Sequence, residues 1–313
     1  MKLLLSKPRG FCAGVERAIE TVEKALEFWG APIYVKHEIV HNRAVVNSLK
    51  AKGAVFIEDI EDVPVGARLI YSAHGVSPAV REAASKRQLI EIDATCGLVT
   101  RVHSAVKRYA ALGYQIILIG HRNHVEIIGT AGEAPDVTTI VESAEDVSKL
   151  NFTQDEKLFY ITQTTLSLDD VKEITESLIQ KYPHIITLPS SSICYATTNR
   201  QLALREITDL TDLVLVVGDP QSSNSNRLRE VASKRGIPSY LINNEKEIEV
   251  EWTAGVKTIG LTAGASTPET IVQKCIQRLI ELGVKDVEDV IFTNEDVVFQ
   301  LPKPIVNAQF PKK

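Results

Sequence analysis

The sequence is short of the patterns that define several common protein classes. Cysteine occurs four times in 313 residues, and no two cysteines are separated by only two residues. The chain therefore lacks the Cys-x-x-Cys pairs of a zinc ribbon or an ordinary ferredoxin. It also contains neither Gly-x-x-x-x-Gly-Lys-Ser/Thr nor Gly-x-Gly-x-x-Gly, which disfavours a P-loop NTPase and a nicotinamide enzyme.

Strong charge and long apolar runs are also missing. The formal net charge is -5 with the charges scattered, so we expect neither nucleic acid nor a membrane as a partner. The longest apolar runs, such as Leu213–Val217, are strand-sized and too short to cross a bilayer. Only Leu3, Leu4 and Leu5 are consecutively apolar near the N-terminus, which does not fit a secretory signal.

These absences predict a cytoplasmic protein, or an organellar one with its transit peptide removed. In such a reducing compartment, cysteines serve as metal ligands, catalysts or inert thiols rather than disulfides.

Short β-branched runs alternate with helical patterns along the whole chain. The expected buried strands cover Arg68–Tyr71, Tyr114–Ile119, Leu158–Thr162, Leu213–Val217 and Val256–Leu261. Apolar residues at three- and four-residue spacing predict helices, one including Val15 to Trp29 and another Ile271 to Leu279. Ser77-Pro78 and Thr267-Pro268 each predict a helix with proline at its first position. Repeated strand–turn–helix units indicate mainly parallel sheets with covering helices.

Three cysteines divide the chain into segments of similar length. Cys12, Cys96 and Cys194 each lie in a turn just before a helical pattern, whereas Cys275 lies on an apolar helical stripe and fits a small core residue. Thiolates from separate modules hold a metal or cluster only if they converge on one point. The spacing therefore predicts three α/β modules, expected at 1–96, 97–193 and 194–281, and a C-terminal extension at 282–313 that packs back on them.

Histidines and hydroxyl-rich turns form two further groups. His41 and His124 lie in polar segments, and His74 follows an expected strand directly before Ser77-Pro78. Polar turns also follow strands at Thr162–Thr165, Ser222–Asn226 and Thr262–Thr267. Small donors and free backbone N–H groups at helix starts suit phosphate without a lysine.

Several of these phrases together resemble the hydroxymethylbutenyl diphosphate reductase family. The likeness runs from Pro8 to about Pro268. It is carried, in the family's order, by Pro8–Val15, His41–Arg43, Ser72–Val76, Asp93–Cys96, Thr162–Ser167, Ile193–Gln201, Ser222–Leu228 and Thr262–Ser266.

The resemblance implies a three-lobed α/β fold around a central cavity. Each lobe would supply one cysteine to a 4Fe-4S cluster with one iron lacking a protein ligand, which can act as a Lewis acid. The family removes the allylic hydroxyl of hydroxymethylbutenyl diphosphate with two electrons and two protons. The products are isopentenyl and dimethylallyl diphosphates and water. An electron donor such as flavodoxin or ferredoxin is implied as a partner.

The same resemblance implies roles for individual residues. The cluster ligands would be Cys12, Cys96 and Cys194. Residues that bind the diphosphate would be His41, His74, His124, Ser222, Ser223, Asn224 and Ser266. Glu126 would deliver protons, with Thr164 hydrogen-bonding the substrate hydroxyl and His124 supporting the relay. Glu126 lies two residues after His124, and both follow an expected strand. We therefore expect one extended stretch to direct both side chains into one cavity.

Three segments depart from the family's usual pattern. Gly97 stands where proline is common, which predicts a less rigid cysteine turn. The segment His121–Glu126 has fewer glycines and prolines than usual, and Asp219–Gln221 replaces serine, lysine and asparagine. None of these departures removes a proposed ligand.

Two other functions fit parts of the pattern. A metal or redox sensor could use three cysteines and a histidine, but it needs neither Glu126 nor the hydroxyl-rich turns. A Cys–His hydrolase would need one cysteine distinguished as the nucleophile, and Cys12, Cys96 and Cys194 have similar contexts.

Overall fold

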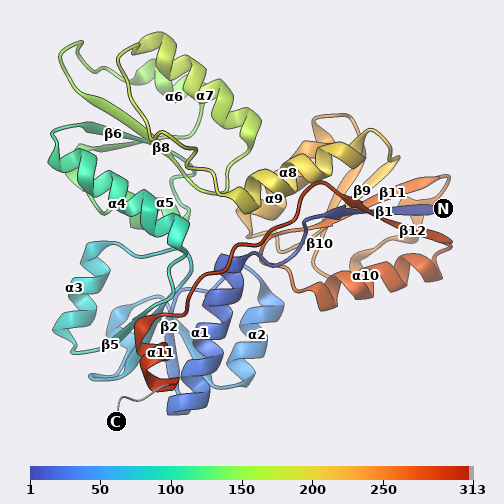
Figure 1. Cartoon of the computed structure of the whole chain (residues 1–313), viewed down its shortest axis with the longest axis horizontal. Coiled ribbons are helices and arrows are strands. Elements are labelled where there is room, and N and C mark those ends of the chain that lie inside the picture. Colours follow the sequence, from blue (N-terminus) through green and yellow to red (C-terminus); the bar gives the residue numbers. More distant parts are fainter. Residues whose placement is uncertain (310–313) are drawn as a thin grey trace. The chain divides into compact units, whose positions relative to one another are not determined.

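The computed structural model describes residues 1–309, which form an α/β protein with three all-parallel sheets within that range (Figure 1). None of the helices in this range is long and apolar enough to cross a membrane. The described residues form two compact parts, which we treat separately. The five-strand body comprises Met1–Val15, His41–Val45 and Tyr195–Val298, and the seven-strand body comprises Glu16–Val40, Val46–Cys194 and the chain from Phe299.

The five-strand body contains one sheet with the order β10-β9-β11-β1-β12. Its strands are β1 (Lys2–Lys7), β9 (Leu213–Val217), β10 (Ser239–Ile242), β11 (Thr258–Ala263) and β12 (Asp286–Ile291). Its helices are α8 (Tyr195–Thr208), α9 (Ser223–Ser233) and α10 (Glu269–Glu281).

The middle of this sheet is apolar on both faces. In β9, Leu213, Leu215 and Val217 pack in one core cluster together with α10, while Val214 and Val216 pack in another with α8 and α9. Figure 1 shows α10 on one face of the sheet and α8 and α9 on the other. A parallel strand covered on both sides needs an uninterrupted apolar run, which is why β9 was recognisable in the sequence.

The seven-strand body contains two sheets. One has the order β3-β2-β4-β5, from β2 (Ile33–Lys36), β3 (Ala54–Ile57), β4 (Arg68–Tyr71) and β5 (Ile90–Asp93). The other has the order β7-β6-β8, from β6 (Gln115–Ile119), β7 (Thr138–Val141) and β8 (Leu158–Thr162). The remaining helices are α1 (Ala13–Trp29), α2 (Arg43–Ala51), α3 (Pro78–Lys86), α4 (Gly97–Ala111), α5 (Val125–Ala131), α6 (Ala144–Lys149), α7 (Leu168–Lys181) and α11 (Lys303–Gln309).

Most expected elements are confirmed. Three predicted strands, at Arg68–Tyr71, Leu158–Thr162 and Leu213–Val217, match residue for residue. The helix predicted after Ser77 begins at Pro78. The prediction for Thr267-Pro268 was wrong by one residue, because Pro268 is the N-cap and α10 begins at Glu269.

The pairing of β1 is a long-range feature. This strand lies between β11 and β12 in the sheet of the five-strand body, although its residues open the segment expected as a first module, 1–96. Likewise, β12 belongs to the expected C-terminal extension, 282–313, and pairs with β1 in parallel. The last four residues of that extension lie outside the described range, and the four-segment division stays a prediction.

Candidate active site

The three predicted cluster cysteines share one local geometry. Cys12 directly precedes α1, Cys96 is the N-cap of α4, and Cys194 directly precedes α8. All three are half-buried. A helix N-terminus carries partial positive charge, which stabilises a thiolate, the form that binds metal. The donor chemistry of these turns therefore suits an iron–sulfur cluster.

Cys275 differs from the other three in every respect. It lies inside α10 in the apolar core of the five-strand body and is fully buried. Burial, with the nearby Glu245 and Glu247, raises the pKa of its thiol to about 12. Cys275 therefore stays protonated and packs as a small apolar residue.

The structure assigns the predicted ligands to different parts. Cys12 belongs to the five-strand body, and Cys96 and Cys194 belong to the seven-strand body. In the range 1–309, no group of three or more His, Cys, Asp or Glu side chains is arranged to hold a metal ion. Convergence of the three thiols, and the central cavity, stay predictions.

Glu126 and Thr164 form a buried pair in the seven-strand body. The exposed fraction of Glu126 is 2% and that of Thr164 is 4%. Glu126 Oε1 accepts a hydrogen bond from the backbone N–H of Thr164 at 2.6 Å, and Oε2 accepts one from Thr164 Oγ1 at 2.9 Å. Burial raises the pKa of Glu126, although the two hydrogen bonds from Thr164 and the nearby His103 oppose that rise. Among the groups that shift this pKa, Thr164 is hydrogen-bonded to the carboxyl group and is neutral, whereas His103 acts only through its charge.

The backbone around Glu126 differs from the sequence expectation. Glu126 lies in the first turn of α5 rather than in an extended stretch, and His124 is the N-cap residue of that helix. His124 Nδ1 accepts the backbone N–H of Glu126 at 3.2 Å. Because Nδ1 is an acceptor, the proton of the neutral ring lies on Nε2. The expectation of an extended stretch was wrong because His124 is the N-cap of a helix. Histidine is not among the residues usually preferred at an N-cap, so the sequence did not indicate a helix start here.

His74 lies near His124 in the same body. Their ring centroids are 6.0 Å apart with an interplanar angle of 83°. Ser72 Oγ lies 3.2 Å from His74 Nδ1, which fixes the orientation of the ring. The structure thus places His74, His124, Glu126 and Thr164 in one body, and the roles assigned to them stay predictions.

A second polar group lies at the carboxyl ends of β9 and β11 in the five-strand body. Ser222, Asn224 and Ser266 are buried, with exposed fractions of 5%, 4% and 7%. Ser266 Oγ donates to the carbonyl of His41 at 2.9 Å and lies 3.5 Å from Ser222 Oγ. Asn224 Oδ1 accepts the backbone N–H of Ala265 at 2.9 Å. Ser223 begins α9 beside them, so the predicted residues of this group gather at one helix start.

Asp219 is a residue of this group that sequence reasoning treated only as a departure. It is 2% exposed, and its Oδ2 accepts the backbone N–H of Arg43 at 3.1 Å. Its Oδ1 accepts the backbone N–H of Gln221 at 2.9 Å. The carboxylate therefore ties the segment of His41 to the turn before α9. An acidic residue two positions after the end of the buried strand β9 was the available signal.

The Cys96 turn has its own support within the seven-strand body. Arg17 Nη1 donates to the carbonyl of Thr95 at 2.9 Å, and Asp93 Oδ1 accepts the backbone N–H of Thr95 at 2.9 Å. A Cβ atom on Gly97 would lie 3.3 Å from Cε1 of Phe299. The absence of a side chain at Gly97 thus leaves room for an aromatic ring, a packing reason that the sequence did not show.

His103 and Glu133 form an ion pair near Glu126 that the sequence did not indicate. His103 Nδ1 lies 2.8 Å from Glu133 Oε1, and both side chains are less than a tenth exposed. Burial alone would raise the pKa of Glu133, but the hydrogen bond and charge of His103 together with Lys107 lower it.

Comparisons with known proteins agree along almost the whole chain. A family model described as LytB protein matches residues 3–280. The 4-hydroxy-3-methylbut-2-enyl diphosphate reductase of Protochlamydia amoebophila (strain UWE25) is 85% identical over 310 residues, covering 99% of this chain and 99% of that protein. The enzyme of the same name from Chlamydia pneumoniae is 63% identical over 306 residues, covering 97% of this chain and 98% of that protein.

Two solved structures are also similar. The E-1-hydroxy-2-methyl-but-2-enyl-4-diphosphate reductase from Plasmodium falciparum matches with a TM-score of 0.96 and 50% identity, covering 98% of this chain and 97% of that chain. A structure of (E)-4-hydroxy-3-methyl-but-2-enyl diphosphate reductase, the terminal enzyme of the non-mevalonate pathway, matches with a TM-score of 0.64 and 31% identity, covering 90% of this chain and 99% of that chain.

Proposed function

The chain belongs to the LytB protein family, and from this premise we propose how its residues perform the reaction of a 4-hydroxy-3-methylbut-2-enyl diphosphate reductase, the terminal enzyme of the non-mevalonate pathway. The reaction removes the allylic hydroxyl of the substrate with two electrons and two protons. It yields water together with isopentenyl or dimethylallyl diphosphate.

The buried pair of Glu126 and Thr164 is the observation that carries the mechanism. A glutamate in water, with a pKa of about 4.3, is a poor proton source at neutral pH. Burial raises the pKa of Glu126, and a bound diphosphate adds negative charge that acts in the same direction. Protonated Glu126 can donate from Oε2 to Thr164 Oγ1, because the two oxygens lie 2.9 Å apart. The Thr164 hydroxyl is then free to donate its own proton to the leaving hydroxyl of the substrate.

His124 would orient this relay. Its Nδ1 accepts the N–H of Glu126, so the Nε2 proton is the one that faces a ligand. We assign Nε2 of His124 to the diphosphate, where a proton next to phosphate oxygens offsets their charge. His74, with its ring fixed beside that of His124, would bind the same group.

Cys12, Cys96 and Cys194 would hold the 4Fe-4S cluster, leaving one iron without a protein ligand. Bound there, the cluster would pass on the two electrons that the reaction needs, one at a time, and would supply a Lewis acid for the substrate oxygen. An electron donor such as flavodoxin or ferredoxin would restore it. A reducing compartment, in the cytoplasm or an organelle, would keep the three thiols available.

The hydroxyl and amide group of the five-strand body would bind the diphosphate. Ser222, Ser223 and Asn224 lie at the start of α9, where the partial positive charge of the helix N-terminus favours an anion. Ser266 and His41 are joined to this helix start by hydrogen bonds. Neutral donors suffice here because the helix start supplies part of the positive charge.

Replacing each cysteine by serine and measuring iron per chain after anaerobic purification tests the assignment of the cluster. Loss of iron is expected for Cys12→Ser, Cys96→Ser and Cys194→Ser. Cys275→Ser is the control, since its thiol is buried in the core. Equal loss of iron from Cys275→Ser would contradict the assignment.

Calorimetry with substrate and with inorganic diphosphate tests the anion site and separates an enzyme from a metal or redox sensor. His41→Asn and His74→Asn should weaken binding of both ligands. His184→Asn is a matched control, because His184 is exposed and its Nε2 contacts only the backbone carbonyl of Glu156 among its hydrogen bonds in the described chain. Unchanged affinity in both variants would remove these histidines from the site.

A further inference from the structure

The chain beyond β12 runs beside the turn that carries Cys12. Strands β1 and β12 are parallel neighbours, with Lys7 opposite Ile291. The backbone N–H of Phe292 continues the pairing by donating to the carbonyl of Lys7 at 2.9 Å. Because both chains leave the sheet at the same edge, the residues after Phe292 accompany those between Lys7 and Cys12.

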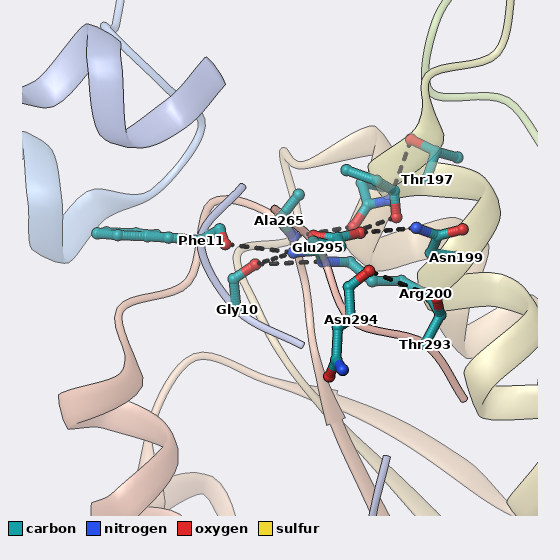
Figure 2. Close-up of polar contacts among 11 residues, drawn as sticks. Gly10, Phe11, Thr197, Asn199, Arg200, Ala265, Thr293, Asn294 and Glu295 are labelled. Carbon is teal, nitrogen blue, oxygen red and sulfur yellow. Dashed lines mark hydrogen bonds and ion pairs between the residues drawn. The ribbon is translucent and has the colours of Figure 1, made fainter. Parts of the chain in front are cut away.

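Arg200 connects the two runs. It lies on α8 and is 1% exposed, which is rare for arginine unless its charge is paired. Its Nε and Nη2 donate to the carbonyl of Gly10 at 3.2 and 2.8 Å, and Nη2 also donates to the carbonyl of Phe11 at 3.2 Å. Figure 2 shows the guanidinium group directed at these two carbonyls.

These bonds fix the peptide unit directly before Cys12 at both ends. The carbonyl of Phe11 accepts from Arg200, and the N–H of Cys12, in the same peptide plane, donates to the carbonyl of Ala265 at 3.2 Å. Because the peptide is planar, two opposed hydrogen bonds determine its orientation. The direction in which the Cys12 side chain leaves the backbone is thereby restricted.

Glu295 supplies the negative charge that this buried cation needs. Its Oε1 and Oε2 lie 3.0 and 3.1 Å from Arg200 Nη1, and its side chain is 13% exposed. Asn199 Nδ2 donates to Oε1 at 3.1 Å, which holds the carboxylate in place (Figure 2). Removing one partner of such a pair leaves an uncompensated buried charge.

We propose that Arg200 and Glu295 are positioning residues for Cys12, through which the chain after β12 sets the geometry of this cysteine before any cluster is present. The significance for cluster assembly rests on the proposed function, in which Cys12 is a ligand. The positioning itself does not, because all of these contacts are made by the polypeptide alone. Lysine could not replace Arg200, since an ammonium lacks the planar fork that reaches two carbonyls and a carboxylate together.

Alkylation of the cluster-free chain by iodoacetamide, with the rate at each cysteine read by peptide mass spectrometry, tests the positioning directly. Arg200→Lys keeps the positive charge but loses the fork, and Glu295→Gln keeps the shape but loses the negative charge. In both variants we expect Cys12 to react about tenfold faster, the scale of one lost charge-assisted hydrogen bond. The rates at Cys96 and Cys194 should change less than about twofold.

Asp209→Asn provides the matched control. Asp209 pairs with Arg235 at 2.8 Å in the same body, but this pair is on the surface, and its hydrogen bonds within residues 1–309 join Asp209, Arg235 and the carbonyl of Arg205. Its loss should leave the rate at Cys12 unchanged. After anaerobic reconstitution, iron loss to a chelator should be faster in Arg200→Lys and Glu295→Gln than in Asp209→Asn.

Two results would overturn the inference. One is a Cys12 alkylation rate in both variants no higher than in Asp209→Asn. The other is an equal rise at all three cysteines, which would show general loosening of the fold. A third result would separate the two proposals. If Cys12 is alkylated faster in Arg200→Lys and Glu295→Gln but Cys12→Ser keeps its iron, the positioning is supported and the ligand role of Cys12 is rejected.

Discussion

Two carboxyl groups in one short segment of the seven-strand body have opposite chemistry. Glu126, in the first turn of α5, and Glu133, just beyond the end of that helix, are both shielded from water. Burial by itself raises the pKa of each. The net shift is upward for Glu126, whose hydrogen-bond donors belong to the neutral Thr164, and downward for Glu133, which contacts His103 and Lys107.

Burial raises the pKa of both carboxyl groups, and the cationic partners His103 and Lys107 reverse the direction of the shift at Glu133. Glu133 is an anion that stabilises structure. The raised pKa of Glu126 favours its protonated form compared with an exposed glutamate, which is the property that the proposed proton relay requires. Pairs of groups whose environments push their pKa values apart are typical of acid–base sites.

The largest expected effect is on turnover, and it distinguishes Glu126 from Glu133. Glu126→Gln keeps the size and hydrogen bonds of the side chain but cannot deliver a proton, so turnover should fall by roughly two to four orders of magnitude. Glu133→Gln should retain turnover within about threefold, because this residue takes no part in the relay. Steady-state rates with a chemical reductant, measured with iron content and substrate affinity, check both. Near-normal turnover of Glu126→Gln would leave it without a catalytic role.

The next effect tests whether the proton passes through Thr164. Thr164→Val removes the Oγ1 that lies 2.9 Å from Glu126 Oε2 but keeps the backbone N–H that also bonds this carboxyl group. Turnover should fall by about two orders of magnitude, the lower end of the range for a positioned acid. Thr164→Ser restores the hydroxyl and should recover most of the rate. Equal rates for the valine and serine variants would reject the relay.

The third effect is on stability. Replacing Glu133 by glutamine keeps a hydrogen bond to His103 but removes the charge, which should cost about 1–3 kcal/mol of unfolding free energy at neutral pH. The folded-state pKa of Glu133 is lowered, so its contribution is present above the ordinary pKa of an unfolded glutamate and is lost as pH falls through the folded pKa. The deficit of the variant should therefore shrink in acid. Denaturant unfolding of both chains at about pH 7 and about pH 4 measures this change.

The smallest expected effect is a gain in stability, opposite to the loss expected for the Glu133 variant. The folded-state pKa of Glu126 is raised, so its charged form costs stability as pH rises from the unfolded value through the folded one. Glu126→Gln should raise the unfolding midpoint at neutral pH by roughly 1–3 °C, and the gain should vanish in acid. Thermal melting of the cluster-free chain across pH gives the result. A variant less stable than the parent at neutral pH would show that ionised Glu126 is well accommodated.

Most of the local structure could be predicted from the sequence. The run Leu213–Val217 reads as a buried strand because a parallel strand is apolar on both faces. The turns of Cys12, Cys96 and Cys194 could be placed before helices because helical periodicity starts directly after each of them. The roles of Glu126 and Thr164 came from a resemblance, and the site residues stay predictions.

What the sequence determined by itself was therefore short-range: the strands, the helices and the polar turns between them. Only the tertiary structure placed β1 between β11 and β12, and brought the hydroxyl of Thr164 to Glu126. It also brought Arg200 to the carbonyls of Gly10 and Phe11, and Glu295 to Arg200. Propensity and periodicity act between neighbouring residues, whereas a hydrogen bond between distant segments depends on which strands pair and which backbone groups remain unpaired at their ends. Those choices follow from the packing of the whole sheet, which no local pattern encodes.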